Sequence, residues 1–230
     1  MFSKLTIYET LFLLTQFSGL SLKNLREFVL LNIDNQKVVD CLISGEIIKY
    51  SSVYKINSFD KTKCLKALEI FRKQEEMGIK AISFLDKEYP FNPNKMSDPP
   101  VLIYRTGNTT ASDRRLPLLA IVGTRKMTAY GKAQIDQFFK TAHEPNFEVI
   151  SGLAYGIDSY SQSVASSSGF KVHSVLAHGL DQTYPKPHIA LRKGLELKGF
   201  TFSEYPIQSP AHKGRFLARN RLIAGMADVV

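Results

Sequence analysis

Several features that define large classes of proteins are absent from this 230-residue sequence. No apolar run approaches the roughly 18 residues that a membrane span requires, so we predict no membrane partner. Glu9 interrupts the apolar start of the chain and no small-residue cleavage site follows, so we predict no signal peptide. The two cysteines, Cys41 and Cys64, lack metal-ligand spacing. We expect a reduced, cytoplasmic protein in which both are small packing residues.

Motifs of catalysis, metal binding and dinucleotide binding are also missing. The five histidines form no HExxH pattern and do not pair with the cysteines, so we predict no metal site. There is no G-x-G-x-x-G, no nucleophile elbow and no Walker lysine loop. Three carboxylates, Asp158, Asp181 and Glu204, each follow a predicted strand, but separate sheet-edge roles are the favoured interpretation. We therefore predict a protein that is not an enzyme, with no catalytic residues and no cofactor.

The composition has an excess of positive charge, and the formal net charge is +9. Residues 1–110 carry 15 Lys and Arg against 12 Asp and Glu, or +3, and residues 111–230 carry 15 against 9, or +6. A positive balance favours a polyanionic partner, although many proteins carry similar charge without one. The excess of positive charge is larger in the second half of the chain.

The first half of the chain has the pattern of short helices followed by extended segments. Apolar residues at spacings of three and four predict two helices within 11–29, with Ser21 as the cap of the second. A longer helix is predicted from Lys61 to Met77, ending at Gly78. Strands are expected at 79–84 and 101–105, and the main linker at 107–116. The predicted domains are therefore a small helical domain (1–78), a strand-containing lead-in and linker (79–115) and an α/β domain (116–230).

In the second half, apolar strand-like runs alternate with helical patterns four times, which predicts a Rossmann-like, doubly wound, mainly parallel sheet. The continuous apolar run 118–122 is typical of a strand covered on both faces. The last helix is predicted from Phe216 to Met226, and 227–230 resembles the start of another strand. A parallel sheet without its last units would leave an open edge, so we expect the domain to be incomplete at this end.

Two motifs that follow predicted strands have the residue types of a phosphate cradle. In the first, Gly123 allows close backbone approach, Thr124 supplies a hydroxyl and Arg125 a planar cation. In the second, SGLAYGID at 151–158, Ser151 and Gly152 follow a strand, and Gly152 and Gly156, four apart before a helix, suit a cradle for phosphate or sugar. A plain strand-to-helix turn explains the first motif equally well, and Asp158 is at least as well explained as a first-turn carboxylate.

Two further motifs carry cations at the same predicted edge of the sheet. Lys186 follows the next strand. Tyr184 in the same loop either stacks on a base or packs beneath the loop, which is the commoner fate of a Tyr before Pro. The segment 213–225 carries three arginines, and we expect Arg215 and Arg219 to share one side of its helix. Leu222, Ile223 and Met226 would then face the sheet, with Asn220 and Arg221 between these faces. A solvated basic helix is the alternative.

Together these motifs resemble the DNA-processing protein A family, also called Smf. The matching segments are VGTR (122–125), SGLAYGID (151–158), HGLDQTYPK (178–186), SEYP (203–206) and RFLARNRLIAG (215–225), in the family's order. The front half resembles the family's small helical domain and lead-in. Tyr155, His188 and Leu217 depart from residues that are common in the family.

The resemblance implies a protein of natural transformation that binds single-stranded DNA, protects incoming strands, helps to load the RecA recombinase and acts as a homodimer. The DNA-binding residues it implies, together with the motifs above, are Gly123, Thr124, Arg125, Ser151, Gly152, Lys186, Arg215, Arg219, Asn220 and Arg221. Two alternatives of the same superfamily are a phosphoribohydrolase acting on nucleoside monophosphates and a sensor of a nucleotide-derived signal.

Overall fold

The computed structural model describes residues 5–17, 21–30, 48–49, 55–56, 60–92, 96–107, 116–142 and 144–230. The chain divides into two compact units, Met1–Ile103 and Tyr104–Val230, and the boundary falls inside strand β4 (Leu102–Thr106). The division into three parts at 78 and 115 stays a prediction. Residues 108–115, which make up most of the predicted linker, lie outside the described residues.

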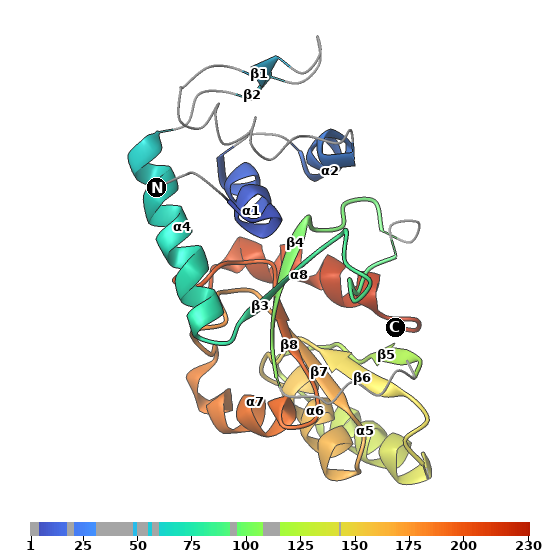
Figure 1. The fold of residues 1–230 in the computed structure, drawn as a ribbon. Coiled ribbons are helices and arrows are strands. Elements are labelled where there is room, and N and C mark those ends of the chain that lie inside the picture. The colour runs from blue at the N-terminus through green and yellow to red at the C-terminus, as the bar shows by residue number, and fades with distance from the viewer. Residues whose placement is uncertain are drawn as a thin grey trace. The chain divides into compact units, whose positions relative to one another are not determined.

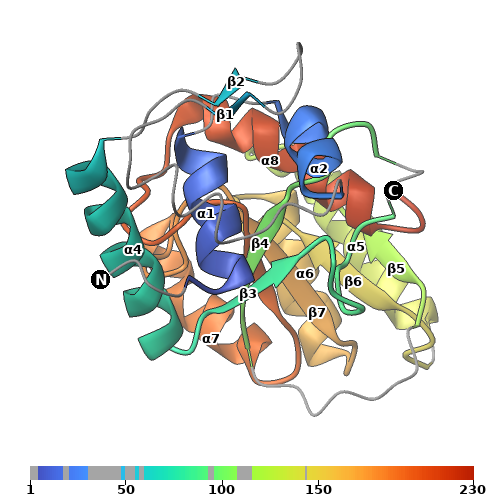
Figure 2. The ribbon, with the colours of Figure 1, turned by 45° about the horizontal axis from the view of Figure 1, so that its top comes forward.

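In the first unit, helix α1 (Ile7–Phe17) packs against helix α4 (Lys61–Glu76) (Figures 1 and 2). The rings of Phe12 and Phe71 are 5.2 Å apart and both side chains are buried, so they form the centre of this small core. Cys64 is buried as predicted, whereas Cys41 lies outside the described residues.

Two predicted helix boundaries in this unit are confirmed, whereas α1 begins at Ile7, ahead of the predicted range. Helix α2 (Leu22–Leu30) begins after Ser21, whose Oγ accepts a hydrogen bond from the Asn24 N–H at 3.2 Å. Helix α4 ends just before Gly78, whose φ of 74° suits a residue without Cβ. The short antiparallel pair β1 (Ile48–Lys49) and β2 (Lys55–Ile56) was not predicted.

The sheet has the strand order β3-β4-β8-β7-β6-β5. Its strands are β3 (Lys80–Ser83), β4, β5 (Leu118–Ala120), β6 (Glu148–Ser151), β7 (Val172–Leu176) and β8 (Thr201–Ser203). The four strands from β5 to β8 are parallel, while β4 runs antiparallel to β8. The prediction of a Rossmann-like, mainly parallel sheet is confirmed.

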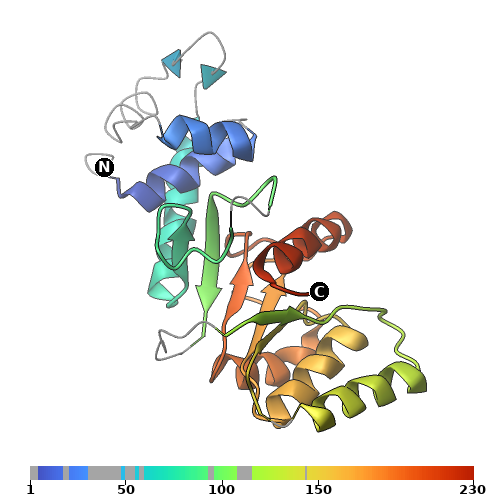
Figure 3. The same ribbon diagram turned by 90° about the vertical axis from the view of Figure 1, so that its right-hand side faces the viewer.

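The helices of the second unit lie on both faces of the sheet. Helices α5 (Ala129–Thr141), α6 (Ile157–Ser167) and α7 (Ile189–Glu196) connect successive neighbouring strands and lie on one face, as right-handed crossovers require (Figure 3). Helix α8 (Lys213–Met226) follows β8 and lies on the other face, in contact with β7 and β5. Within the described residues, no helix combines the length and apolar character of a membrane span.

Two predicted boundaries differ from the structure. Strand β5 ends at Ala120, and Val122 is 47% exposed, because β5 is the last strand of the sheet order rather than a central one like the fully buried β7. Helix α8 begins at Lys213, three residues before the predicted Phe216, since the His212 side chain accepts a hydrogen bond from the Gly214 N–H. Beyond α8, Val229 forms a parallel bridge with Leu119, in agreement with the predicted start of a strand.

Candidate nucleic-acid interface

The candidate site lies at the carboxyl ends of strands β5 to β8, where loops from all four parallel strands leave the same edge of the sheet. This edge is where ligands bind in open parallel sheets. Each of the four motifs identified in the sequence contributes to it: the loop after β5, the loop after β6, the loop after β7 and the start of α8.

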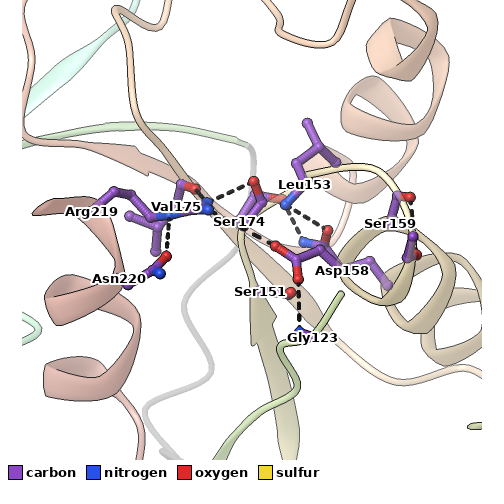
Figure 4. Close-up of polar contacts among 12 residues, drawn as sticks. Gly123, Ser151, Leu153, Asp158, Ser159, Ser174, Val175, Arg219 and Asn220 are labelled. Carbon is purple, nitrogen blue, oxygen red and sulfur yellow. Dashed lines mark hydrogen bonds and ion pairs between the residues drawn. The ribbon is translucent and has the colours of Figure 1, made fainter. Parts of the chain in front are cut away.

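Arg219 is the buried centre of this edge (Figure 4). One guanidinium nitrogen donates hydrogen bonds to the carbonyl oxygens of Gly152 and Val175, at 2.7 and 2.6 Å. The Nε donates to Asn220 Oδ1 at 3.2 Å. Because these partners are protein groups and only 3% of the residue is exposed, the side chain connects the elements of the site rather than reaching solvent.

The predicted orientation of Arg219 on its helix is therefore wrong. Arg219 lies on the buried face of α8 together with Leu222 and Ile223. These residues are three and four positions further along, and that spacing places all three on one side of a helix. Arg215 does not share this buried position, since its guanidinium lies over the Tyr205 ring at 4.5 Å.

Asp158 is the carboxylate that faces Arg219. Its Oδ2 lies 3.9 Å from Arg219 Nη2, and its Oδ1 accepts a hydrogen bond from the Gly123 N–H at 3.3 Å (Figure 4). Burial raises the pKa of the Asp158 carboxyl, while the charge of Arg219 and the N–H groups of Gly123, Ala154 and Gly152 oppose this rise. Asp158 thus connects the loops after β5 and β6, consistent with a structural rather than a ligand role.

The glycines of the first two motifs allow loops and helices to pack closely. A Cβ on Gly123 would lie 2.7 Å from the Ile157 side chain, and one on Gly152 would lie 1.9 Å from the Arg219 guanidinium. Gly156 has a φ of 82°, and its Cβ would lie 2.2 Å from the Thr124 carbonyl oxygen. Contacts within the protein therefore account for all three glycines.

The loop after β6 is held from several sides. Ser151 is buried, and its Oγ donates a hydrogen bond to the Ile121 carbonyl oxygen at 2.6 Å. Leu153 has a left-handed φ of 55°, which is costly for a residue with a branched side chain. Its N–H donates to Gln162 Oε1 at 3.1 Å and its carbonyl oxygen lies 2.9 Å from His188 Nδ1, so the surrounding structure maintains this conformation.

Two buried side chains, which the sequence analysis did not identify, form hydrogen bonds with the backbone of the loop after β7. Arg192 donates hydrogen bonds to the carbonyl oxygens of Leu180 and Gln182, at 2.9 and 2.6 Å. His178 Nε2 accepts from the Tyr184 N–H at 3.2 Å, and burial lowers the pKa of His178. With its polar groups directed inward, the loop leaves the Tyr184 and Lys186 side chains exposed.

Aromatic rings and exposed cations occur together on the outer side of this edge. Arg125 is exposed, and its guanidinium lies 4.9 Å from the centroid of the Phe216 ring. Phe216 is in turn 5.6 Å from the Tyr184 ring. Burial lowers the pKa of Arg219, the charge of Asp158 opposes this, and the nearby charge of Arg125 adds to the lowering. Three of the four motifs therefore meet around Phe216, a residue the sequence analysis did not single out.

The structure places the ten predicted binding residues in three groups. Gly123, Thr124, Arg125, Lys186 and Asn220 are exposed, Arg215 and Arg221 are partly buried, and Ser151, Gly152 and Arg219 are buried. Thr124 Oγ1 accepts a hydrogen bond from the Lys126 N–H at 3.1 Å. Whether any of these residues contacts DNA stays a prediction.

The carboxylates that follow the strands have separate partners. Asp158 faces Arg219, Asp181 Oδ2 accepts a hydrogen bond from the Gln208 N–H at 2.9 Å, and Glu204 forms an ion pair with Arg221. Across the described part of the chain, no cluster of three or more His, Cys, Asp or Glu side chains could hold a metal ion.

Comparison with known proteins gives the family. Residues 80–230 match the family model described as DNA recombination-mediator protein A, which covers more than half of the chain. The chain belongs to this family. The DNA processing protein DprA of Bacillus subtilis is 32% identical over 155 residues, which are 67% of this chain and 52% of that protein. The corresponding protein of Streptococcus pneumoniae is 33% identical over 146 residues, 64% of this chain and 51% of that protein.

Solved structures agree with this assignment. The crystal structure of DprA from Streptococcus pneumoniae matches 97% of this chain and 76% of its own, with a TM-score of 0.69 and 26% identity. A structure of the Helicobacter pylori protein, described for its single-stranded DNA binding mode, matches 66% of this chain and 67% of its own, with a TM-score of 0.55 and 28% identity. The chain spans about half the length of the curated relatives from Bacillus and Streptococcus.

Proposed function

We propose that the protein binds single-stranded DNA at the carboxyl edge of its parallel sheet, with little sequence preference. The observation that carries this proposal is the meeting of the exposed Arg125 with Phe216 and Tyr184, which brings together a cation and two aromatic rings from two loops and the first turn of α8. A single strand offers both a phosphate backbone for cations and unstacked bases for aromatic rings. The similarity to the Helicobacter pylori protein, which binds single-stranded DNA, supports this choice of ligand.

In this proposal the predicted binding residues have two different roles. Arg125, Lys186, Arg215 and Arg221 contact phosphates, with Thr124, Asn220 and the Gly123 backbone beside them. Ser151, Gly152 and Arg219 are buried and act by positioning the loops. Tyr184, which is 47% exposed, and Phe216 stack on bases.

The test is a titration of a fluorescent oligonucleotide by anisotropy at several salt concentrations. Because each phosphate contact with a single strand contributes about −0.7, four contacts predict a log–log slope of about −3. Arg125→Ala should weaken binding about three- to tenfold and reduce the slope by about 0.7. The control is Lys140→Ala, which removes one exposed charge from the last turn of α5. Binding that is insensitive to salt, or equal losses for both variants, would contradict the proposal.

The same proposal includes the absence of catalysis. Asp158 and Glu204 each face an arginine, and Asp181 accepts a backbone hydrogen bond. These contacts do not pair the three carboxylates with one another as a catalytic acid and base. Incubation with nucleoside monophosphates should release no free base, which chromatography of the products can measure. Release of base would favour a phosphoribohydrolase instead.

The biological role proposed here is protection of incoming DNA and loading of RecA during natural transformation, in the cytoplasm, by a homodimer. Membership of a recombination-mediator family supports it. Light scattering should give the mass of two chains, and the protein should accelerate assembly of RecA on a single strand that is already covered by another binding protein. A monomer that does not change RecA assembly would remove this part of the proposal.

A further inference from the structure

Glu204 and Arg221 form an ion pair at the edge of the site. Glu204 follows directly after β8, and Arg221 lies in the middle of α8. Arg221 Nη2 donates hydrogen bonds to both carboxylate oxygens, at 2.6 and 2.5 Å. The Arg221 side chain is 24% exposed and the Glu204 side chain 17%, so the pair lies within reach of solvent.

The pair is part of a larger charged group around Tyr205. The Arg215 guanidinium lies 4.5 Å from the Tyr205 ring centroid. Burial and the charge of Glu204 raise the pKa of Tyr205, while Arg215 and Arg221 oppose this rise. Glu204 is therefore a negative charge placed among two of the cations that the proposed function assigns to phosphates.

This ion pair differs from the buried pair of Asp158 and Arg219. The side chains of that pair are only 6% and 4% exposed, and Arg219 also donates hydrogen bonds to backbone carbonyl oxygens, so a ligand cannot replace its carboxylate. The Glu204 carboxylate is more accessible, since its side chain is 17% exposed. A phosphate uses the same guanidinium hydrogen bonds as a carboxylate.

We propose that Glu204 competes with DNA phosphate for Arg221 and thereby sets the affinity of the site. This inference rests on the proposed single-stranded DNA binding. In the free protein the carboxylate holds the position that a phosphate takes in the complex, so the strand must displace it and overcome its repulsion. Such a residue lowers the affinity of the site for polyanions in general. Tight binding is then limited to strands whose bases also stack on the aromatic rings.

The experiment compares the wild-type chain with Glu204→Gln, which keeps the shape and a hydrogen-bond acceptor but removes the charge. Anisotropy titrations across salt concentrations should show about three- to tenfold tighter binding of a single-stranded oligonucleotide by the variant. The log–log salt slope should stay nearly unchanged, because Arg221 contacts one phosphate in both complexes and only the competing carboxylate charge is removed. The matched control is Glu144→Gln, an exposed charge before the start of β6, which should change affinity much less.

A second pair of variants localises the effect. In an Arg221→Met background, Glu204→Gln should give no further gain in affinity, because the group for which the carboxylate competes is missing. Equal gains in both backgrounds, or equal gains for Glu204→Gln and Glu144→Gln, would show a general charge effect and overturn the inference. Weaker binding by a folded Glu204→Gln variant would show that Glu204 positions Arg221 and would also overturn it. Failure of the wild-type chain to bind single strands would instead contradict the proposed function.

Discussion

Replacing Arg219 by methionine separates a positioning role from a direct contact with DNA. Methionine favours the helix and is apolar, but it cannot reach the Gly152 and Val175 carbonyl oxygens with hydrogen bonds. The change would also leave the Asp158 carboxylate, whose side chain is 6% exposed, without the arginine that faces it. Removing one partner of a buried ion pair costs about 3–5 kcal/mol, so we expect the free energy of unfolding of the second unit to fall by that amount.

Urea denaturation followed by circular dichroism measures this loss, and the double variant Asp158→Asn/Arg219→Met identifies its cause. Asparagine still accepts the Gly123 hydrogen bond but carries no charge, so the double variant should regain about 2 kcal/mol. In DNA titrations, Arg219→Met should lower affinity without changing the salt slope, because a buried guanidinium releases no counterions from a strand. A loss of stability below about 1 kcal/mol together with a slope reduced by about 0.7 would refute the reasoning and make Arg219 a phosphate contact.

Two further predictions concern the stability of the second unit. Burial lowers the pKa of His173, against the effect of Glu148, so below about pH 6.5 the unfolded chain binds a proton that the folded chain does not. Stability should therefore fall as pH decreases from 7.5 to 5.5, by up to about 1.4 kcal/mol per pH unit. In thermal melts, His173→Gln should reduce this pH dependence. An unchanged pH dependence in the variant would contradict the role given to His173. Gly156→Ala should cost about 2–4 kcal/mol, because the new Cβ would lie 2.2 Å from the Thr124 carbonyl oxygen at a φ of 82°. Gly194→Ala, in α7 with no atom within 4 Å of its Cβ position, is the control and should be neutral or stabilising in the same urea titration.

The fold was predictable because its signals are local. Apolar runs and helical spacing alternate along the second half, and this alternation alone predicts parallel strands joined by helices. The start of α8 was predicted three residues too late, since it depends on the His212 side chain as a cap, and histidine is not among the common capping residues. The exposure of Val122 depends on strand order, which a single strand's composition does not determine.

The meeting of the four motifs at one edge of the sheet was predictable, but the packing of their residues was not. Gly123 and Gly152 have the appearance of a phosphate cradle, yet each is explained by a side chain from a later segment, Ile157 and Arg219. Nothing near a glycine in the sequence indicates which distant side chain will pack against it. An exposed position is the usual expectation for Arg219 because arginine is seldom buried, although its spacing from Leu222 already placed it on the apolar face.

The connections made by Arg219 also bear on how the family can vary. One side chain joins α8, the end of β7, the loop after β6 and, through Asp158, the loop after β5. Changes in these four segments are therefore expected to show epistasis, with combined effects that differ from the sum of the single ones. A loop transplanted from a relative should function only when the residues that meet this arginine are transplanted with it.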